Sequence, residues 1–189
     1  MADKEQPTKR QIAKAMNHAS KLPVNIKVTT AFISKIDAKV KRLFRYILAD
    51  YRHRFKIKYI NTPMSVVIMG IDPENSPSGY LGVTIEGDER MLVQIEDHRI
   101  RDEDEKTHFW VETKFIENLC HELVHVCQNL TDPECKRRWC YIAHNKKDEE
   151  EAYFFNRFEI EARILEQFYR DKYGINIFMS GRKDIEITK

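Results

Sequence analysis

Residues 111–130 carry the pattern that most limits how this chain can fold. Apolar side chains recur there every three or four positions, which predicts an amphipathic α-helix with one buried face. This apolar stripe consists of Phe115, Ile116, Leu119, Leu123, Val126 and Leu130. The polar side chains on another side of the same helix are Asn118, His121, Glu122, His125 and Asn129. The fold must therefore bury one side of this helix and keep two histidines and a glutamate together beside the core.

The two histidines stand in the order H-E-x-x-H, with Glu122 directly after the first. Side chains four residues apart on a helix face the same way, with Cβ atoms ~5–6 Å apart. His121 and His125 can therefore hold one Zn²⁺ ion from a single helical face, and Glu122 suits a base for the water that zinc activates. A helix whose histidines only make local hydrogen bonds is the alternative. The apolar stripe predicts the helix independently of the motif, and it favours the metal site.

A catalytic zinc site needs three protein ligands and an open position for water, so one ligand must come from elsewhere in the chain. The sequence predicts a last long helix over residues 148–173, ended by Gly174. Its apolar stripe is expected to include Phe154, Phe155, Phe158, Ile160, Ile164, Leu165 and Phe168. The acidic side chains that border this stripe, each a candidate third ligand, are Glu149, Glu151, Glu159 and Glu161.

In this combination of motifs the chain resembles the gluzincin type of zincin metallopeptidase. In that group a helix with H-E-x-x-H is followed by a second helix with a glutamate ligand, often within E-x-x-A. The segment E-I-E-A at residues 159–162 fits this pattern, and a second E-x-x-A stands at residues 149–152. The resemblance covers residues 110–165 and extends to small zincin-like proteins of phages and bacteria. It implies one catalytic Zn²⁺ ion held by His121, His125 and Glu159.

The resemblance also implies a fold and a reaction. The expected fold is α+β and zincin-like, with a small mixed or antiparallel sheet packed on the H-E-x-x-H helix and on a second ligand-bearing helix. The expected reaction is hydrolysis of a peptide or protein substrate, in which zinc lowers the pKa of its water to ~7 and Glu122 is the general base. Tyr153, His144 and Arg157 are candidates to stabilise the oxyanion. Residues 91–97 are expected at the sheet edge, where an extended peptide can add as another strand.

The rest of the pattern predicts helices near the N-terminus and short strands after them. A short helix is expected over residues 10–20, and a long helix from Thr29 or Thr30 through Tyr51. Strands are expected over residues 55–60, 65–71, 80–86, 91–97 and 175–179, the third and fourth of them as a hairpin. We divide the chain into a basic N-terminal helical segment, 1–54, and a zincin-like metallopeptidase domain, 55–189, which form one compact unit.

Charge is unevenly distributed along the chain. Residues 1–60 hold fifteen Lys and Arg side chains against four acidic ones, whereas the other 129 residues hold 17 basic and 26 acidic side chains. The basic half is compatible with contact to nucleic acid or to an acidic partner, and also with a solvated helix face. No apolar run approaches the ~20 residues that span a bilayer, and the start has no apolar region of a secretory signal. We expect a cytoplasmic protein with no membrane partner, or a virion-packaged one if the origin is a phage.

The four cysteines are expected as thiols, because a chain of 189 residues without a secretory signal does not depend on a disulfide framework. Cys120 points away from the neighbouring His121 and is expected in the core. An alternative metal site is a small structural zinc knot, although only one cysteine pair has the usual tight spacing. Its ligands would be Cys127, Cys135, Cys140 and His144. A zincin-like binding module of virion or regulatory type, with little hydrolysis, is the alternative function.

Overall fold

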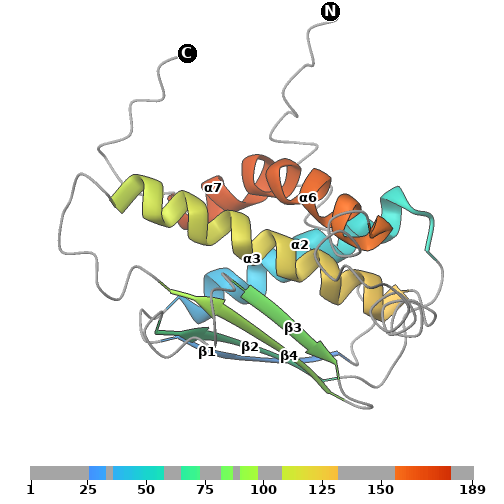
Figure 1. The fold of residues 1–189 in the computed structure, drawn as a ribbon, viewed down its shortest axis with the longest axis horizontal. Coiled ribbons are helices and arrows are strands. Elements are labelled where there is room, and N and C mark those ends of the chain that lie inside the picture. Colours follow the sequence, from blue (N-terminus) through green and yellow to red (C-terminus); the bar gives the residue numbers. More distant parts are fainter. Residues whose placement is uncertain are drawn as a thin grey trace, which may run out of the picture.

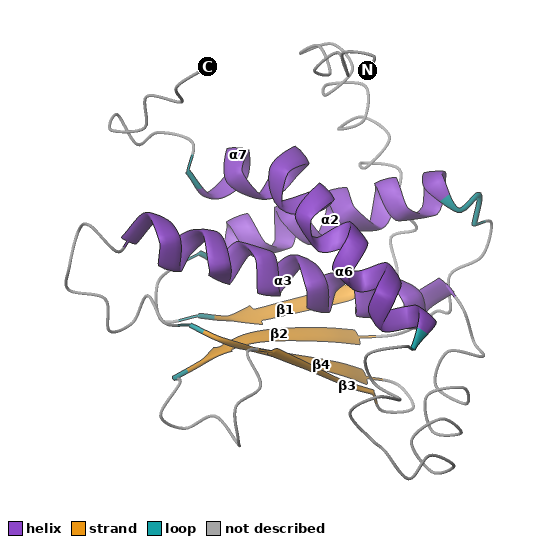
Figure 2. Cartoon of the chain, turned by 45° about the horizontal axis from the view of Figure 1, so that its top comes forward, coloured by secondary structure: helices purple, strands orange, loops and turns teal. Residues whose placement is uncertain are grey.

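The described part of the protein is a sheet covered on one face by helices (Figures 1 and 2). The computed structural model describes residues 26–32, 36–57, 65–72, 82–86, 90–97, 108–131 and 156–179. The prediction of a mixed chain of helices and strands with a small sheet is confirmed. Within these ranges, the helices are all too short or too polar to cross a membrane.

Four strands form the sheet in the order β1-β2-β4-β3. They are β1 (Lys27–Ala31), β2 (Ser65–Ile71), β3 (Gly82–Glu86) and β4 (Arg90–Glu96). The predicted hairpin is confirmed by antiparallel pairing of β3 with β4, while β1, β2 and β4 run parallel. The prediction that residues 91–97 form the sheet edge is wrong, because β4 pairs with β2 on one side and with β3 on the other. The edge strands of the described sheet are β1 and β3.

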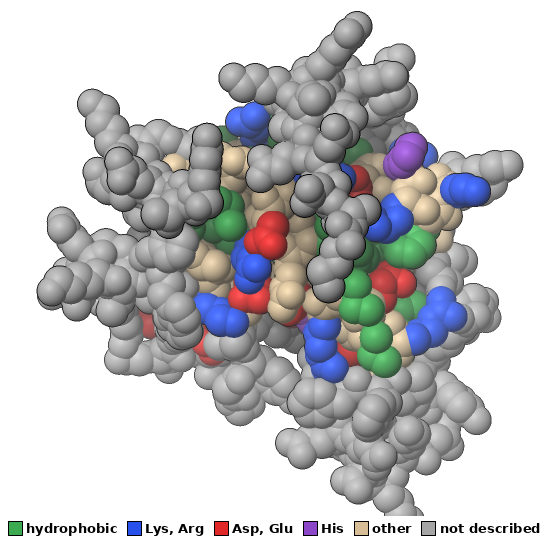
Figure 3. Space-filling model, turned by 90° about the horizontal axis from the view of Figure 1, so that it is seen from above, with side chains coloured by type: hydrophobic (Ala, Val, Ile, Leu, Met, Phe, Trp, Pro, Cys, Tyr) green, Lys and Arg blue, Asp and Glu red, His purple; other side chains and the backbone are tan. Residues whose placement is uncertain are grey.

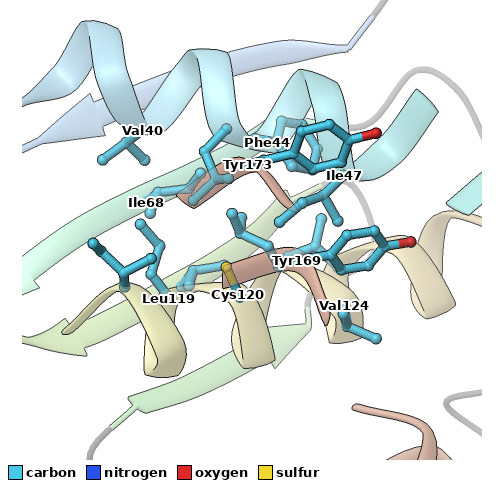
Figure 4. Packing of buried hydrophobic residues seen from close by; sticks show 14 of the residues in the cluster. Val40, Phe44, Ile47, Ile68, Leu119, Cys120, Val124, Tyr169 and Tyr173 are labelled. Atoms are coloured by element: carbon cyan, nitrogen blue, oxygen red, sulfur yellow. The ribbon is translucent and has the colours of Figure 1, made fainter. Parts of the chain in front are cut away.

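Helix α2 (Asp37–Arg54) confirms the long helix predicted in the N-terminal segment. Its buried side chains, which share one hydrophobic core with the sheet and the other helices, are Val40, Leu43, Phe44, Ile47, Leu48 and Tyr51. Figure 4 labels Val40, Phe44 and Ile47 among them. The predicted start at Thr29 or Thr30 is wrong, because those residues pair with β2 as part of β1. The predicted strand at 55–60 is wrong over its described part, since the Ile57 amide bonds back to the Arg52 carbonyl at 2.9 Å. Lys56 has a φ of 53°, which turns the chain out of the helix.

Helix α3 (His108–Thr131) confirms the helix that the H-E-x-x-H motif requires. All six side chains of its predicted apolar stripe are buried. The helix packs across β3 and β4 and against α6 (Arg157–Tyr169). The next residues form a turn of π-helix, η3 (Arg170–Gly174), and a last helical turn, α7 (Ile175–Phe178). The predicted stop at Gly174 and the predicted strand at 175–179 are therefore wrong.

Gly174 has a packing role rather than a terminating one. A Cβ atom at this position would lie 2.3 Å from Cγ2 of Ile116, so the backbone of η3 approaches α3 as closely as only glycine allows. Tyr169 and Tyr173 stack with ring centroids 6.1 Å apart on the same segment, and both are buried (Figure 4). The helical path therefore does not end at Gly174 but runs from α6 through the π-turn into α7.

The predicted stripe of α6 is correct at Phe158 and Leu165, which are buried, but wrong at three positions. Ile160, Ile164 and Phe168 are 41%, 67% and 36% exposed. Relative to the predicted stripe, α6 is rotated about its axis, and it buries Glu159 toward α3. The same rotation turns residues 160, 164 and 168 outward. Figure 3, which looks onto the helix side, shows exposed hydrophobic side chains beside Lys and Arg side chains.

Asn156 marks the start of α6. It has an extended backbone, with φ −65° and ψ 128°, and its side chain accepts a hydrogen bond from the Phe158 amide at 2.9 Å. This is an N-cap, so α6 begins at Arg157 rather than at residue 148. The predicted helix over residues 10–20 and the first part of the predicted helix 148–173, residues 148–155, lie outside the described residues.

Candidate metal centre

Two histidines from α3 and one glutamate from α6 meet between the two helices. The Nε2 atoms of His121 and His125 lie 3.1 Å apart. Glu159 faces both rings: its Oε2 is 3.3 Å from Nε2 of His121, and its Oε1 is 3.0 Å from Nε2 of His125. These three side chains are a group that could hold a metal ion. The spacing of four residues aligns the histidines, and the early position of Glu159 in α6 brings its carboxylate to them.

The tautomer of His121 follows from its contact with Glu166. Nδ1 of His121 lies 2.7 Å from Oε2 of Glu166, a distance typical of a strong charge-assisted hydrogen bond. A carboxylate only accepts, so Nδ1 carries the proton in this bond. In the neutral ring Nε2 then holds a lone pair, and this lone pair faces His125 and Glu159.

The tautomer of His125 follows in the same way from Gln128. Nδ1 of His125 lies 2.8 Å from Oε1 of Gln128, while Nε2 of Gln128 donates to the Phe158 carbonyl and to Glu161 at 2.9 and 3.2 Å. Both hydrogens of the amide nitrogen are thus used, and the amide oxygen must be the atom that faces His125. Nδ1 of His125 therefore carries a proton and donates, and Nε2 is left with its lone pair toward His121.

When both rings are neutral, three electron-pair donors therefore converge on one small volume. The Oε2 atom of Glu159 is buried and lies 3.3 Å from Nε2 of His121. Ligand atoms held by Zn²⁺ at 2.0–2.2 Å in a tetrahedron lie about 3.3 Å apart, close to the distances found here. Two imidazoles and a carboxylate are ligands that zinc and neighbouring transition metals accept. The residues present fit such an ion.

Without a metal, a proton takes its place. Burial disfavours the imidazolium form of His121, but hydrogen bonds to Glu159 and Glu166 and the charge of Glu122 raise the pKa to about 10. Burial also disfavours the carboxylate form of Glu159, but the adjacent rings of His121 and His125 lower the pKa to about 2. At neutral pH the metal-free group is therefore a buried ion pair, and a metal must displace its proton.

Glu122 and Arg163 lie around this group. Glu122 is 6% exposed, and its negative charge contributes to the raised pKa of His121. The Arg163 guanidinium is 3.7 Å from Oε2 of Glu159, with a third of its side chain exposed. Sequence reasoning missed Arg163 as a neighbour of the group. The available signal was its position one helical turn after Glu159.

The other candidate residues have different surroundings. Glu161 accepts hydrogen bonds from Tyr51 and Gln128 and does not face the histidines' Nε2 atoms. Arg157 is exposed at the start of α6, and its guanidinium lies 4.8 Å from the ring centroid of Phe158. The remaining candidates lie outside the described residues: Glu149, Glu151, Tyr153 and His144.

Cys120 and Cys127 are buried thiols in the core. Burial raises the pKa of each well above its ordinary value, so both stay protonated at neutral pH. The prediction of a core thiol at Cys120 is confirmed. The other ligands of the alternative zinc knot, Cys135, Cys140 and His144, lie outside the described residues.

Comparisons of the chain with protein-family models, with curated proteins and with solved structures found no match. The interpretation of the site therefore depends on its own residues: their spacing on two helices, their burial and their hydrogen-bond partners.

Proposed function

We propose that this protein is a zinc-dependent peptidase of zincin-like type, with zinc held by His121, His125 and Glu159. The convergence of three electron-pair donors from an H-E-x-x-H helix and a second helix is the observation that carries the proposal. Structural support also comes from the partners of both rings, since metal-binding histidines commonly donate their other nitrogen to a carboxylate or carbonyl oxygen. Glu166 and the Gln128 amide have this relation to the two rings.

Zinc at this position would act as a Lewis acid and lower the pKa of a water to about 7. In the proposed reaction Glu122 takes the proton of the attacking water and delivers it to the leaving amine. Its position directly after a metal ligand in the sequence and its burial suit a base rather than a fourth ligand. Arg163 joins Tyr153 and His144 as a candidate to stabilise the oxyanion, because its guanidinium lies near Glu159 and is partly exposed.

A peptide substrate is supported by the edge strand beside α3. Among the described strands β3 pairs with β4 alone, so one side of its backbone is not used in the described sheet. The edge of a sheet can bind an extended peptide through main-chain hydrogen bonds. Helix α3 contacts β3 as well as β4. We therefore propose β3, in place of β4, as the strand on which a peptide or protein substrate is aligned.

Metal analysis combined with a peptidase assay tests this proposal. Purified full-length protein should carry about one zinc per chain, which His121→Ala and Glu159→Ala should lose. Glu122→Gln should keep the metal and lose cleavage of a quenched fluorescent peptide library. Glu117→Gln is the matched control, since Glu117 is a buried glutamate of the same helix that pairs with Lys114 and Arg170. Zinc retained by Glu159→Ala, or full cleavage by Glu122→Gln, would refute the assigned roles.

Contact with nucleic acid or an acidic partner through residues 1–60 is a separate proposal, based on their excess of basic side chains. Some of these basic side chains make contacts within the protein. Lys39 donates to the Phe178 carbonyl at 2.7 Å, and Arg54 pairs with Asp50 at 3.5 Å. Binding through phosphates should weaken steeply as salt rises. A salt titration of DNA and RNA binding tests it, and an affinity that does not change with salt would contradict it.

A further inference from the structure

Gln128 is a buried polar side chain that contacts the metal group directly. It is 1% exposed, and each of its amide hydrogens and its amide oxygen has a defined partner. The oxygen accepts from Nδ1 of His125, and the nitrogen donates to the Phe158 carbonyl and to Oε1 of Glu161. One side chain of α3 thus connects a candidate metal ligand to two points on α6.

This connection extends to a third helix. The hydroxyl of Tyr51, a buried residue of α2, donates to the same Oε1 atom of Glu161 that accepts from Gln128. The hydrogen bonds therefore run from α2 to α6 and then to α3. Glu161, which the sequence offers as a possible third ligand, is instead the acceptor that joins two donors from two other helices.

We propose that Gln128, Glu161 and Tyr51 are positioning residues that fix the tautomer and the orientation of His125 for metal binding. Helix α2 is then part of the metal centre, although it contributes no ligand. This inference depends on metal binding by the proposed triad, but it does not depend on peptide hydrolysis.

The physical reason is that each alternative arrangement brings two acceptors together. If His125 carried its proton on Nε2, the lone pair of Nδ1 would face the Gln128 oxygen at 2.8 Å. If the amide of Gln128 turned over to repair this, its oxygen would face the Phe158 carbonyl and the Glu161 carboxylate. Both arrangements lose hydrogen bonds in a buried place, which is costly. The network thus leaves the Nε2 lone pair of His125 directed at the metal position.

Cobalt binding to the full-length protein tests the proposal, because Co²⁺ takes the place of Zn²⁺ and its absorption spectrum reports ligand geometry. Outer partners of metal ligands typically contribute 10–100-fold to affinity. We expect Gln128→Leu to weaken Co²⁺ and Zn²⁺ binding by about this factor and to alter the Co²⁺ spectrum. Tyr51→Phe should weaken binding less, by about a few-fold, and in the same direction.

Long-range ¹H–¹⁵N spectra of the imidazoles give a second readout that loss of stability alone would not change. In the metal-free wild type we expect His125 with its Nδ1 position protonated, and in Gln128→Leu a change of this signal toward a mixture of tautomers. Tyr173→Phe is the matched control for Tyr51→Phe. It also removes a phenol–carboxylate hydrogen bond, from Tyr173 to Asp50 at 3.2 Å, but this bond leads to neither histidine.

Exchange of the amide and the carboxylate between positions 128 and 161 provides a test by rescue of metal affinity. Gln128→Glu alone places two carboxylates side by side and should weaken metal binding. Combination with Glu161→Gln restores one donor and one acceptor between the two positions, and should recover part of the lost affinity. Wild-type affinity, spectrum and tautomer in Gln128→Leu would overturn the inference, as would an equal loss in Tyr173→Phe and Tyr51→Phe. Absence of Co²⁺ binding in the wild type would overturn the metal site itself, whereas failure of peptide cleavage alone would affect only the proposed reaction.

Discussion

Zinc affinity should keep rising with pH well above neutrality, because the metal replaces a proton in the site. In the metal-free protein burial opposes a charged His121, but hydrogen bonds to Glu159 and Glu166 raise its pKa to about 10. Metal binding requires the lone pair of Nε2, so below pH 10 this histidine must release a proton when zinc binds. Glu159 has its pKa lowered to about 2 and contributes no proton in this range.

The number of protons released sets the size of the effect. One proton gives a tenfold change in affinity per pH unit, which corresponds to about 1.4 kcal/mol. Between pH 7 and pH 9 the affinity for zinc should therefore rise by about a hundredfold from His121 alone. A histidine with an ordinary pKa of about 6.5 would instead give a constant affinity above about pH 7.5.

The same two groups make the stability of the metal-free protein depend on pH. At high pH this stability falls, whereas the affinity for zinc rises. The raised pKa of His121 stabilises the fold fully below pH 6.5, and this contribution is lost as the pH rises through about 10. The lowered pKa of Glu159 stabilises the fold above pH 4.5, and this contribution is lost as the pH falls through about 2. Both contributions are complete between these limits, from pH 4.5 to pH 6.5.

Competition with a chelator of known pH dependence measures the affinity in half-unit steps from pH 6 to pH 9.5. Calorimetry at pH 8 in buffers with different ionisation enthalpies counts the protons released. Glu166→Gln should lower the pH at which the affinity becomes constant, because it removes one of the carboxylates that raise the pKa of His121. His53→Ala, a change of an exposed histidine, should have no effect. A constant affinity above pH 7.5 in the wild type, or no proton released at pH 8, would refute the reasoning.

Three further predictions concern the helices that carry the site, each measured by urea unfolding of the metal-free protein. Gly174→Ala should lower the free energy of unfolding by about 1–3 kcal/mol, because the added Cβ meets Ile116. When it is combined with Ile116→Ala, the two losses should be less than additive, and simple additivity would contradict the proposed clash. Leu165→Ala should lower the free energy of unfolding by about 2–5 kcal/mol, whereas Ile164→Ser should change it by less than about 0.5 kcal/mol. The reverse order would contradict the orientation of α6, which buries Leu165 and exposes Ile164. Asn156→Ala should cost about 1 kcal/mol through loss of the N-cap, while Asn156→Asp should retain most of the stability.

The α3 side of the centre could be predicted because it depends on local helix geometry. The apolar stripe placed the helix, and the spacing of four residues placed His121 and His125 on one face. The partner on α6 was harder to predict, since four glutamates border the expected stripe. The choice depends on the rotation of that helix about its axis, which is a matter of its packing against α3. The N-cap at Asn156 also lay within the predicted helix rather than at its start.

Other differences arise from contacts between distant parts of the chain. Thr29 and Thr30 suit a helix N-cap, but pairing of β1 with β2 extends that segment into the sheet. Gly174 has the residue type of a helix stop, yet its lack of a side chain serves a close contact with Ile116 from a helix more than fifty residues earlier. Local preference cannot distinguish such uses of the same residue type, because the deciding neighbour is remote in sequence.

The motif H-E-x-x-H does not by itself make a metal site, because it does not specify which nitrogen of each ring has a lone pair. Here that choice is made by Glu166 for His121 and by Gln128 for His125, two residues outside the motif. Glu166 lies in the same helix as Glu159, two turns further along the same face. One rotation of α6 therefore supplies both the carboxylate that completes the triad and the carboxylate that orients a ring. A helix with histidines that only satisfied local hydrogen bonds would not require Glu159 and Glu166 to face them from α6.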